Sequence, residues 1–163
     1  MALRTIITED DPVLNKVCRP VEKFDERLHF LLDDMNETLA VSNGVGLAAP
    51  QVGILRRVAL VMDAEENVIE LVNPTIIHEE GEQTGLEGCL SVPGKYGVVT
   101  RPMKVTVRAQ DRNGNVFEVS GEELTARCFC HELAHLDGHL YSELCDRLYT
   151  NEELDQMMEE DDE

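Results

Sequence analysis

Basic residues are scarce in this chain of 163 residues, which has 14 lysines and arginines against 33 aspartates and glutamates. The formal net charge is −19. Such a surface repels a phosphate backbone, which argues against direct binding of nucleic acid. The last segment, "NEELDQMMEEDDE" at 151–163, is rich in acidic residues and has no basic one, so we expect it to be a solvated tail.

Long apolar runs are also missing. The start of the chain, "MALRTIITEDDP", lacks the charged region and continuous apolar stretch of an export signal. No later segment approaches the roughly 18 apolar residues that cross a membrane. The five cysteines are an odd number, so we expect no disulfide framework and a reducing compartment. These features predict a cytoplasmic protein without membrane contact, with one domain over residues 1–150 followed by the acidic tail.

Short strand-like segments fill the middle of the chain. "RVALVM" and "VIELVNP" flank the polar "DAEEN", and "KVTVRAQ" and "NVFEVS" flank "DRNG", in which Asn113 and Gly114 suit a tight turn. Between these two predicted hairpins, "GLEGCLSV" and "YGVVTRP" are also strand-like. Neighbouring segments of this length pair most simply as antiparallel strands.

Helical patterns lie on both sides of the strands. After Asp25, a residue type that caps helices, apolar residues recur at helical spacing as far as "SNG" at 42–44. A second helix is expected to begin near Ser120, which with Glu123 matches the S-x-x-E capping box, and to end at Gly138. A weaker helical pattern starts at 151. The sequence therefore predicts an α+β fold, with antiparallel sheets packed around the helix near the C-terminus and the first helix beside them.

The second predicted helix carries "HELAH" at 131–135. Residues four apart lie on one face of a helix, so His131 and His135 could bind one metal ion. Glu132 directly follows the first histidine and is too close to join both in a relaxed tetrahedral set. It could instead reach a metal-bound water as a general base, which is the role of the glutamate in the H-E-x-x-H pattern.

A catalytic metal site needs a third protein ligand and one open position. Glu152 or Glu153 in that role would indicate a zinc endopeptidase. Cys128 faces the same side of the helix one turn earlier, but three ligands on one short helix rarely reach tetrahedral angles. Cys89, in "LEGCLSV", would present a thiolate from a separate element and is the stronger candidate.

Other residues near these ligands have different expected places. Cys130 points away from the metal face and is expected to pack in the core, and His139 is expected at the surface. Gly44 and Gly46, in "GVGLAAPQVG" at 44–53, allow the backbone to approach a ligand closely. Gln51, in the same stretch, supplies an amide that can donate a hydrogen bond to a developing oxyanion.

Three segments together resemble those of the peptide deformylases, which remove the formyl group from the N-terminal methionine of nascent chains. They are "GVGLAAPQ" at 44–51, "EGCLS" at 87–91 and "HELAH" at 131–135, and they stand in the family's order. The resemblance covers about residues 4–150 and includes "DPVLNKVCRPV" near the start. It implies formylated nascent peptides as the substrate.

The resemblance implies that Cys89, His131 and His135 hold one metal ion per chain, with water in the fourth position. The implied native ion is Fe(II), which Zn(II), Ni(II) or Co(II) can replace. From the residue types alone, the expectation is only a divalent ion that accepts sulfur and nitrogen ligands.

The resemblance also implies catalytic roles. Glu132 would take a proton from the attacking water and deliver it to the leaving amine. The side chain of Gln51 and the backbone N–H of Leu90 would stabilise the oxyanion. Glu87 and Arg101 would pair and steady the strand that presents the thiolate.

The substrate would lie along the glycine-rich backbone as an added strand and place its methionine in an apolar pocket. The implied strand-pairing positions are Gly44, Val45, Gly46 and Gly88, and the implied pocket residues are Val45, Leu124 and Cys128.

Some positions depart from the family pattern. The family commonly has Q-H-E-x-D-H, where this chain has Cys130 and Ala134, so a residue that supports ligand orientation is missing. This motivates a further alternative, a metal-binding homologue without activity. An arginine common after "EGCLS" is replaced by "GKYG", where Lys95 or Tyr96 would meet the peptide. The acidic tail does not suit ribosomal RNA, which leaves basic ribosomal proteins near the exit tunnel as partners.

Overall fold

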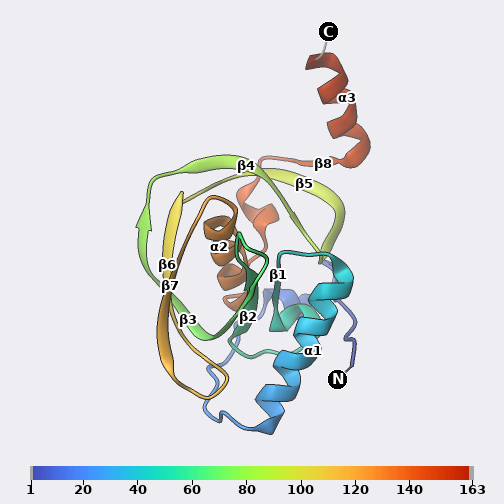
Figure 1. Cartoon of the computed structure of the whole chain (residues 1–163). Coiled ribbons are helices and arrows are strands. Elements are labelled where there is room, and N and C mark those ends of the chain that lie inside the picture. The colour runs from blue at the N-terminus through green and yellow to red at the C-terminus, as the bar shows by residue number, and fades with distance from the viewer. Residues whose placement is uncertain (1, 162–163) are drawn as a thin grey trace.

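The computed structural model describes residues 2–161 and contains two antiparallel sheets and three α-helices (Figure 1). The α-helices are α1 (Glu26–Ser42), α2 (Leu124–Leu136) and α3 (Asn151–Asp161). The strands are β1 (Gly46–Ala48), β2 (Val58–Met62), β3 (Val68–Glu80), β4 (Gln83–Cys89), β5 (Val92–Arg101), β6 (Lys104–Gln110), β7 (Val116–Glu122) and β8 (Leu148–Thr150). Short 3-10 helices span Pro12–Asn15, Ala49–Val52 and Tyr141–Leu144. The predicted α+β fold is confirmed.

The larger sheet has five strands in the order β1-β2-β3-β6-β7, and the smaller sheet has three in the order β4-β5-β8. The strands curve around α2, which lies inside them (Figure 1). Eleven of the 13 residues of α2 are buried. A helix that is buried on nearly every side can carry polar groups into a dry interior, where their interactions with charges are strong.

Strand β2 is buried on both faces, which explains its continuous apolar sequence. Val58 and Leu60 pack in the cluster that α1 covers, whereas Val61 packs with α2. This alternation follows from the period of two along a strand. The strand therefore connects the two parts of the core.

Helix α1 forms where the helical pattern predicts it. The side chain of Asp25 accepts a hydrogen bond from the Leu28 backbone N–H, 3.4 Å away, and caps the first turn. The helix ends at Asn43, whose φ of 56° is left-handed. Its apolar stripe, which includes Leu32 and Met35, is fully buried. This helix positions the glycine-rich segment that follows it.

The predicted start of the second helix is wrong. Ser120 lies on β7, and its Oγ is 2.7 Å from the Thr106 Oγ1 on the neighbouring strand. The β6–β7 ladder continues to the pair Lys104 and Glu122, so strand pairing overrides the capping-box pattern. Glu123, with φ of 54°, then turns the chain into α2. The predicted end is close, since Gly138 follows α2 with φ of +83°, as a C′ glycine does.

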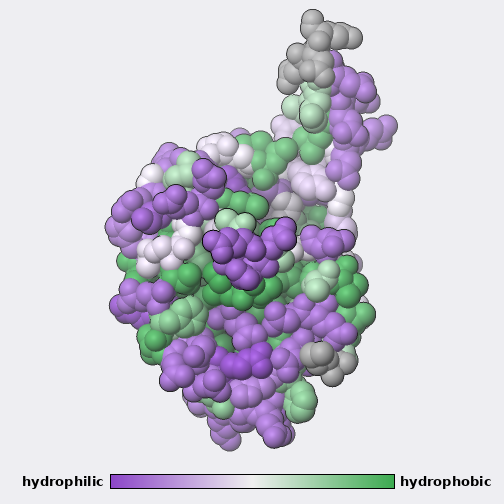
Figure 2. Space-filling model, viewed as in Figure 1, coloured by the Kyte–Doolittle hydropathy of each residue, from purple (hydrophilic) through white to green (hydrophobic). Residues whose placement is uncertain are grey.

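The acidic segment forms a helix, as the weaker pattern predicted, at least as far as the structure describes it. Helix α3 stands off the body of the protein, and hydrophilic side chains cover much of its surface (Figure 2). Residues 162–163 of the tail lie outside the described residues. Among the described helices, none has the length and apolar character needed to cross a membrane. All five cysteines are free.

Candidate metal centre and active site

A cysteine and two histidines meet between the helix and the smaller sheet. Cys89 is the last residue of β4, and His131 and His135 lie one turn apart on α2. The possible ligand atoms of these three residues lie within 4.8 Å of one another. The Cys89 Sγ is 3.3 Å from the His135 Nε2. The structure thus assembles the three residues that the sequence suggested as metal ligands.

The two imidazoles have different surroundings. The His131 Nδ1–H donates to the Glu87 Oε1 at 2.7 Å. The Nε2 of the same ring is therefore available to bind a metal ion together with Cys89. The His135 Nδ1 is fully buried and has no hydrogen-bond partner among the described residues. Burial and the neighbouring His131 lower the pKa of His135 to about 3, so its ring is neutral. For His131, burial lowers the pKa, but hydrogen bonds with Cys89 and Glu87 raise it to about 10.

Glu87 is the centre of a buried ionic cluster. The predicted pair with Arg101 is confirmed, with Nε and Nη2 at 3.0 and 2.9 Å from the two carboxylate oxygens. Sequence reasoning missed Arg127, whose Nη1 lies 2.6 Å from the Glu87 Oε2. Burial opposes ionisation of Glu87, but its hydrogen bonds to His131 and Arg101 lower its pKa to about 2. Arg127 could have been found from its position four residues before His131, on the same helix face.

The pKa of Glu87 predicts how the stability of the metal-free protein depends on pH. The folded pKa lies below the ordinary value of 4.5, so the carboxylate stabilises the fold above about pH 4.5, and this stabilisation is lost as pH falls toward about 2. Glu87→Gln should lower the free energy of unfolding by on the order of 3 kcal/mol near neutral pH. The difference from wild type should shrink in acid, as urea unfolding at several pH values would show. Glu82→Gln, at an exposed position before β4, is the control and should change little.

Glu132 is buried beside the metal group. Its side chain is 5% exposed, and its Oε1 lies 3.9 Å from the His131 Nε2. The Oε2 has no hydrogen-bond partner among the described residues. Burial raises the pKa of Glu132 to about 7, with the charge of Glu87 acting in the same direction. A carboxyl group with this pKa can both accept and release a proton near neutral pH.

Gly46 makes room for this carboxyl group. A Cβ at position 46 would lie 2.8 Å from the Glu132 Oε1. We expect Gly46→Ala to displace the carboxylate and to lower kcat about 100-fold, because a shift of about 1 Å can have that effect. The metal content should be unchanged. Gly85→Ala is the matched control, since a Cβ there would make an ordinary contact of 3.5 Å, and its kcat should stay near that of wild type.

Gln51 is held in one orientation at the edge of the site. Its Oε1 accepts a hydrogen bond from the Ala48 N–H at 2.9 Å, so its Nε2 faces the other way. The Nε2 donates to the Ser91 Oγ at 3.0 Å and lies 3.5 Å from the Cys89 Sγ. The sequence did not single out Ser91, which is fully buried. The amide donor is therefore fixed beside the proposed thiolate ligand.

A cavity of about 390 Å³ opens onto these groups. Its walls include every substrate-binding residue that the sequence suggested, together with Gln51, Leu90, Glu132 and two metal-ligand candidates. Lys95 and Tyr96 also line it. The lining residues proposed from sequence are Gly44, Val45, Gly46, Gly88, Leu124 and Cys128.

The donor set fits a divalent ion. A thiolate with two imidazoles suits iron, zinc, nickel or cobalt better than calcium or magnesium. His131 is oriented by a carboxylate through its other ring nitrogen, which is the usual support for a ligating histidine. The Glu132 carboxyl group, with its Oε1 near His131 and its buried Oε2 without a partner among the described residues, fits a group that acts on a water at the ion.

Comparison with known proteins agrees with this geometry. A family model for polypeptide deformylase matches residues 3–151. The chain belongs to this family. It is 60% identical over 143 residues to the peptide deformylase of Agathobacter rectalis, covering 88% of this chain and 90% of that one. It is 51% identical to that of Caldanaerobacter subterraneus subsp. tengcongensis, with 98% and 99% covered. A peptide deformylase structure from Legionella pneumophila superposes with a TM-score of 0.83 at 40% identity, covering 96% of each chain.

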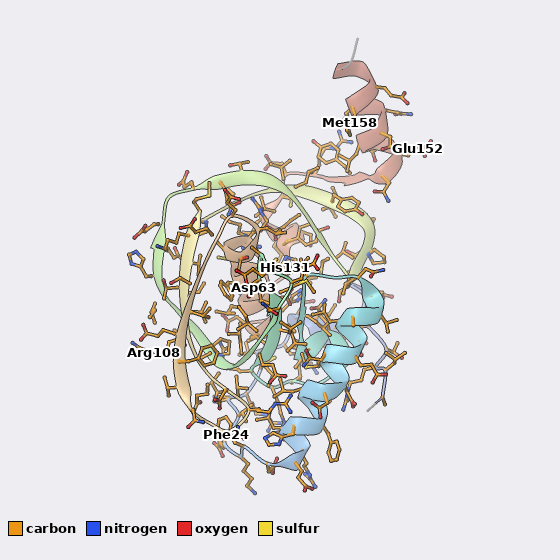
Figure 3. The ribbon with its side chains drawn as sticks, in the orientation of Figure 1. Phe24, Asp63, Arg108, His131, Glu152 and Met158 are labelled. Carbon is orange, nitrogen blue, oxygen red and sulfur yellow. The ribbon has the colours of Figure 1, made fainter. Side chains whose placement is uncertain are left out.

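Membership in the deformylase family decides between the alternatives. The protein is a metallo-hydrolase that removes the formyl group from N-terminal methionine. Glu152 and Glu153, the ligands that an endopeptidase would need, lie on α3, and Figure 3 places Glu152 far from His131. Glu153 forms an ion pair with Arg147 instead.

Cys130 and His139 lie away from the metal group, as the sequence predicted, but position 134, from which support for a ligand was expected, also lies away from it. Cys130 is buried in the core with Phe129 and Leu133, and His139 is exposed beyond the end of α2. Ala134 and Cys130 line a separate cavity behind the helix. Residue 134 therefore does not face the metal group, and the support of His131 comes from Glu87.

Proposed function

We propose that Glu132 and Gln51 carry out the deformylation chemistry at an ion held by Cys89, His131 and His135. The observation that supports this most directly is the position of Glu132: it lines the cavity, its Oε1 lies 3.9 Å from the His131 Nε2, and its buried Oε2 has no hydrogen-bond partner among the described residues. The backbone N–H of Leu90, which follows the thiolate ligand, completes the set. The native ion that we propose is Fe(II), with Zn(II), Ni(II) or Co(II) able to replace it.

When bound, the ion would act as a Lewis acid and lower the pKa of a water molecule in its open position. Glu132 would accept a proton from the attacking water as the water oxygen bonds to the formyl carbon. The same carboxyl group passes the proton to the amine nitrogen as the C–N bond breaks, which releases formate and a free N-terminus. A pKa of about 7 suits both transfers.

Gln51 supplies a donor to the carbonyl oxygen as it gains negative charge. Its Nε2 is directed by the Ala48 hydrogen bond and needs no reorientation during the reaction. The Leu90 N–H approaches from the turn after β4. The two donors, one from the 3-10 helix that contains Gln51 and one from the turn after β4, would then hold the oxyanion at a defined position.

The substrate peptide is proposed to pair with β1, an edge strand of the larger sheet. Gly44, Val45 and Gly46 would offer their backbone on one side and Gly88 on the other. Leu124 and Cys128 would receive the methionine side chain, and burial raises the pKa of the Cys128 thiol to about 12, so it stays neutral in an apolar pocket.

The assay that tests this function uses the whole chain loaded anaerobically with Fe(II) or Ni(II). Free amine released from a formyl-methionyl dipeptide is followed, with the acetyl-methionyl dipeptide as the matched substrate. We expect turnover of the formyl peptide alone. Absence of turnover in protein shown to contain one ion per chain would contradict the proposed function.

Helix α3 is the proposed contact with the ribosome. Met157 and Met158 are exposed on a helix that is otherwise mainly acidic, so a basic protein near the exit tunnel is a better partner than RNA. The cytoplasm is the matching location. In this proposal residues 1–150 form the catalytic domain, and removing 151–163 should leave dipeptide turnover unchanged while weakening sedimentation with ribosomes.

A further inference from the structure

The metal ligands come from two parts of the fold that have few direct contacts. Helix α2 packs mainly against the larger sheet, through β1, β2, β6 and β7. Cys89 is on the smaller sheet, which touches α2 chiefly through β5. The relative positions of the thiolate and the imidazoles therefore depend on whatever joins α2 to β4.

The Glu87 cluster makes that connection. The carboxylate of Glu87, two residues before Cys89, accepts four hydrogen bonds from three side chains. Its Oε1 receives the Arg101 Nη2–H and the His131 Nδ1–H, and its Oε2 receives the Arg101 Nε–H and an Arg127 Nη1–H. All four residues are less than 9% exposed. Charged hydrogen bonds in such a dry place are strong and sensitive to geometry.

Arg127 differs from Arg101 because it comes from the helix. It lies four residues before His131, so both side chains leave the same face of α2 and reach the same carboxylate. Its Nη1 also donates to the Val99 carbonyl oxygen on β5 at 3.1 Å. One guanidinium nitrogen thus joins α2 to both β4 and β5.

We propose that Arg127 is a positioning residue for the metal site: it holds the Glu87 carboxylate against His131 and fixes α2 at its distance from the strand that carries Cys89. This inference rests on the proposed metal ligands, but not on the deformylation steps. It also explains how His131 is oriented although this chain has alanine at position 134. The supporting carboxylate is that of Glu87 on β4, and Arg127 on α2 holds it in place.

Arg127 also lines the substrate cavity, so a role in substrate binding alone is the main competing explanation. The two roles differ in what they change. A pocket residue changes the KM for the peptide, whereas a positioning residue changes the affinity for the ion in the absence of any peptide.

The experiment measures Zn(II) and Ni(II) affinity by competition with a chromophoric chelator. The proteins are the full-length wild type, Arg127→Met and Arg127→Lys. We expect Arg127→Met to bind each ion about 10- to 100-fold more weakly, as is typical when a group that orients a ligating histidine is lost. Lysine can still donate to Glu87 and should recover most of the affinity. Thermal unfolding of the metal-free proteins, followed by circular dichroism, measures any general loss of stability separately.

The matched control is Arg57→Met. Arg57 also joins α2 to the rest of the fold, through Asp137 at 2.9 Å and the Pro74 carbonyl oxygen at 3.1 Å, but it does not contact Glu87. Its loss should lower stability without changing the affinity for the ion. If Arg57→Met and Arg127→Met weaken metal binding equally, the effect is a general loosening of the helix and the proposal is wrong.

A double-mutant cycle with Glu87→Gln gives the decisive result. If Arg127 acts through Glu87, adding Arg127→Met to Glu87→Gln should change the affinity less than about twofold, because interacting sites are not additive. Fully additive losses would overturn the proposal. So would wild-type affinity in Arg127→Met, and an effect confined to the KM for the peptide would then assign Arg127 to the pocket.

Discussion

Replacing Glu132 by glutamine is expected to lower kcat for a formyl-methionyl dipeptide about 1,000-fold while the protein keeps its metal. Proton transfer by a positioned carboxyl group contributes about 100- to 10,000-fold to such reactions. The glutamine amide has nearly the same shape, so the buried site should still fold around it. Its nitrogen cannot accept the proton of the attacking water. The measurement is single-turnover amine release, with the metal content of each sample determined in parallel.

The control for this substitution is Glu152→Gln, which removes one negative charge on α3 away from the metal group. Its kcat should equal that of the wild type. Loss of the ion together with activity in Glu132→Gln would show that the carboxylate is a ligand. Unchanged turnover would remove Glu132 from the reaction altogether.

Replacing Cys89 by alanine is expected to abolish both metal retention and turnover. The thiolate is the only ligand that the group takes from the smaller sheet, and the two remaining imidazoles lie on one helix. Two neutral ligands bind a divalent ion far more weakly than a set that includes a thiolate. After gel filtration in the presence of a weak chelator, the variant should contain no ion, and its amine release should match the buffer blank.

Cys145→Ala is the matched control for this second substitution. Cys145 packs in the same small cluster as Cys89, with Val92, Val99 and Tyr141, but is not part of the metal group. It should keep one ion per chain and full turnover. Retention of the ion in Cys89→Ala would mean that another residue completes the site, and the assignment of the thiolate would have to be abandoned.

Local patterns predicted the parts of the fold that depend on local chemistry. The cap at Asp25 and the strand formed by "RVALVM" are such cases, and so is the spacing of His131 and His135. The capping box at Ser120 failed because a competing interaction, the ladder with β6, comes from a strand that a local pattern does not include. Pairing with a strand outside the local pattern can override a helix-start signal, as it does here where β7 runs directly into α2.

The residues of the candidate site also divide into those that local sequence patterns predict and those that they do not. Its ligands and glycines stand in short recognisable motifs, but Arg127 and Ser91 act through side chains that meet only in the folded protein. The buried His135 Nδ1, which has no hydrogen-bond partner among the described residues, is likewise a feature of the folded protein alone. Spacing on one helix could have suggested that Arg127 and His131 share a partner, but it could not have identified Glu87 as that partner.

Because the ligands come from two elements far apart along the chain, they are synthesised at different times. Along the chain, 46 positions separate Cys89 from His135, and ribosomes add residues from the N-terminus at a limited rate. Cys89 is therefore synthesised before His131 and His135, and until then its thiol has no histidine beside it. Strand β8, the other neighbour of β5 in the sheet that carries Cys89, is completed later still. Each copy can bind its ion only after both histidines have been made, so the processing of nascent chains at any moment depends on copies made earlier.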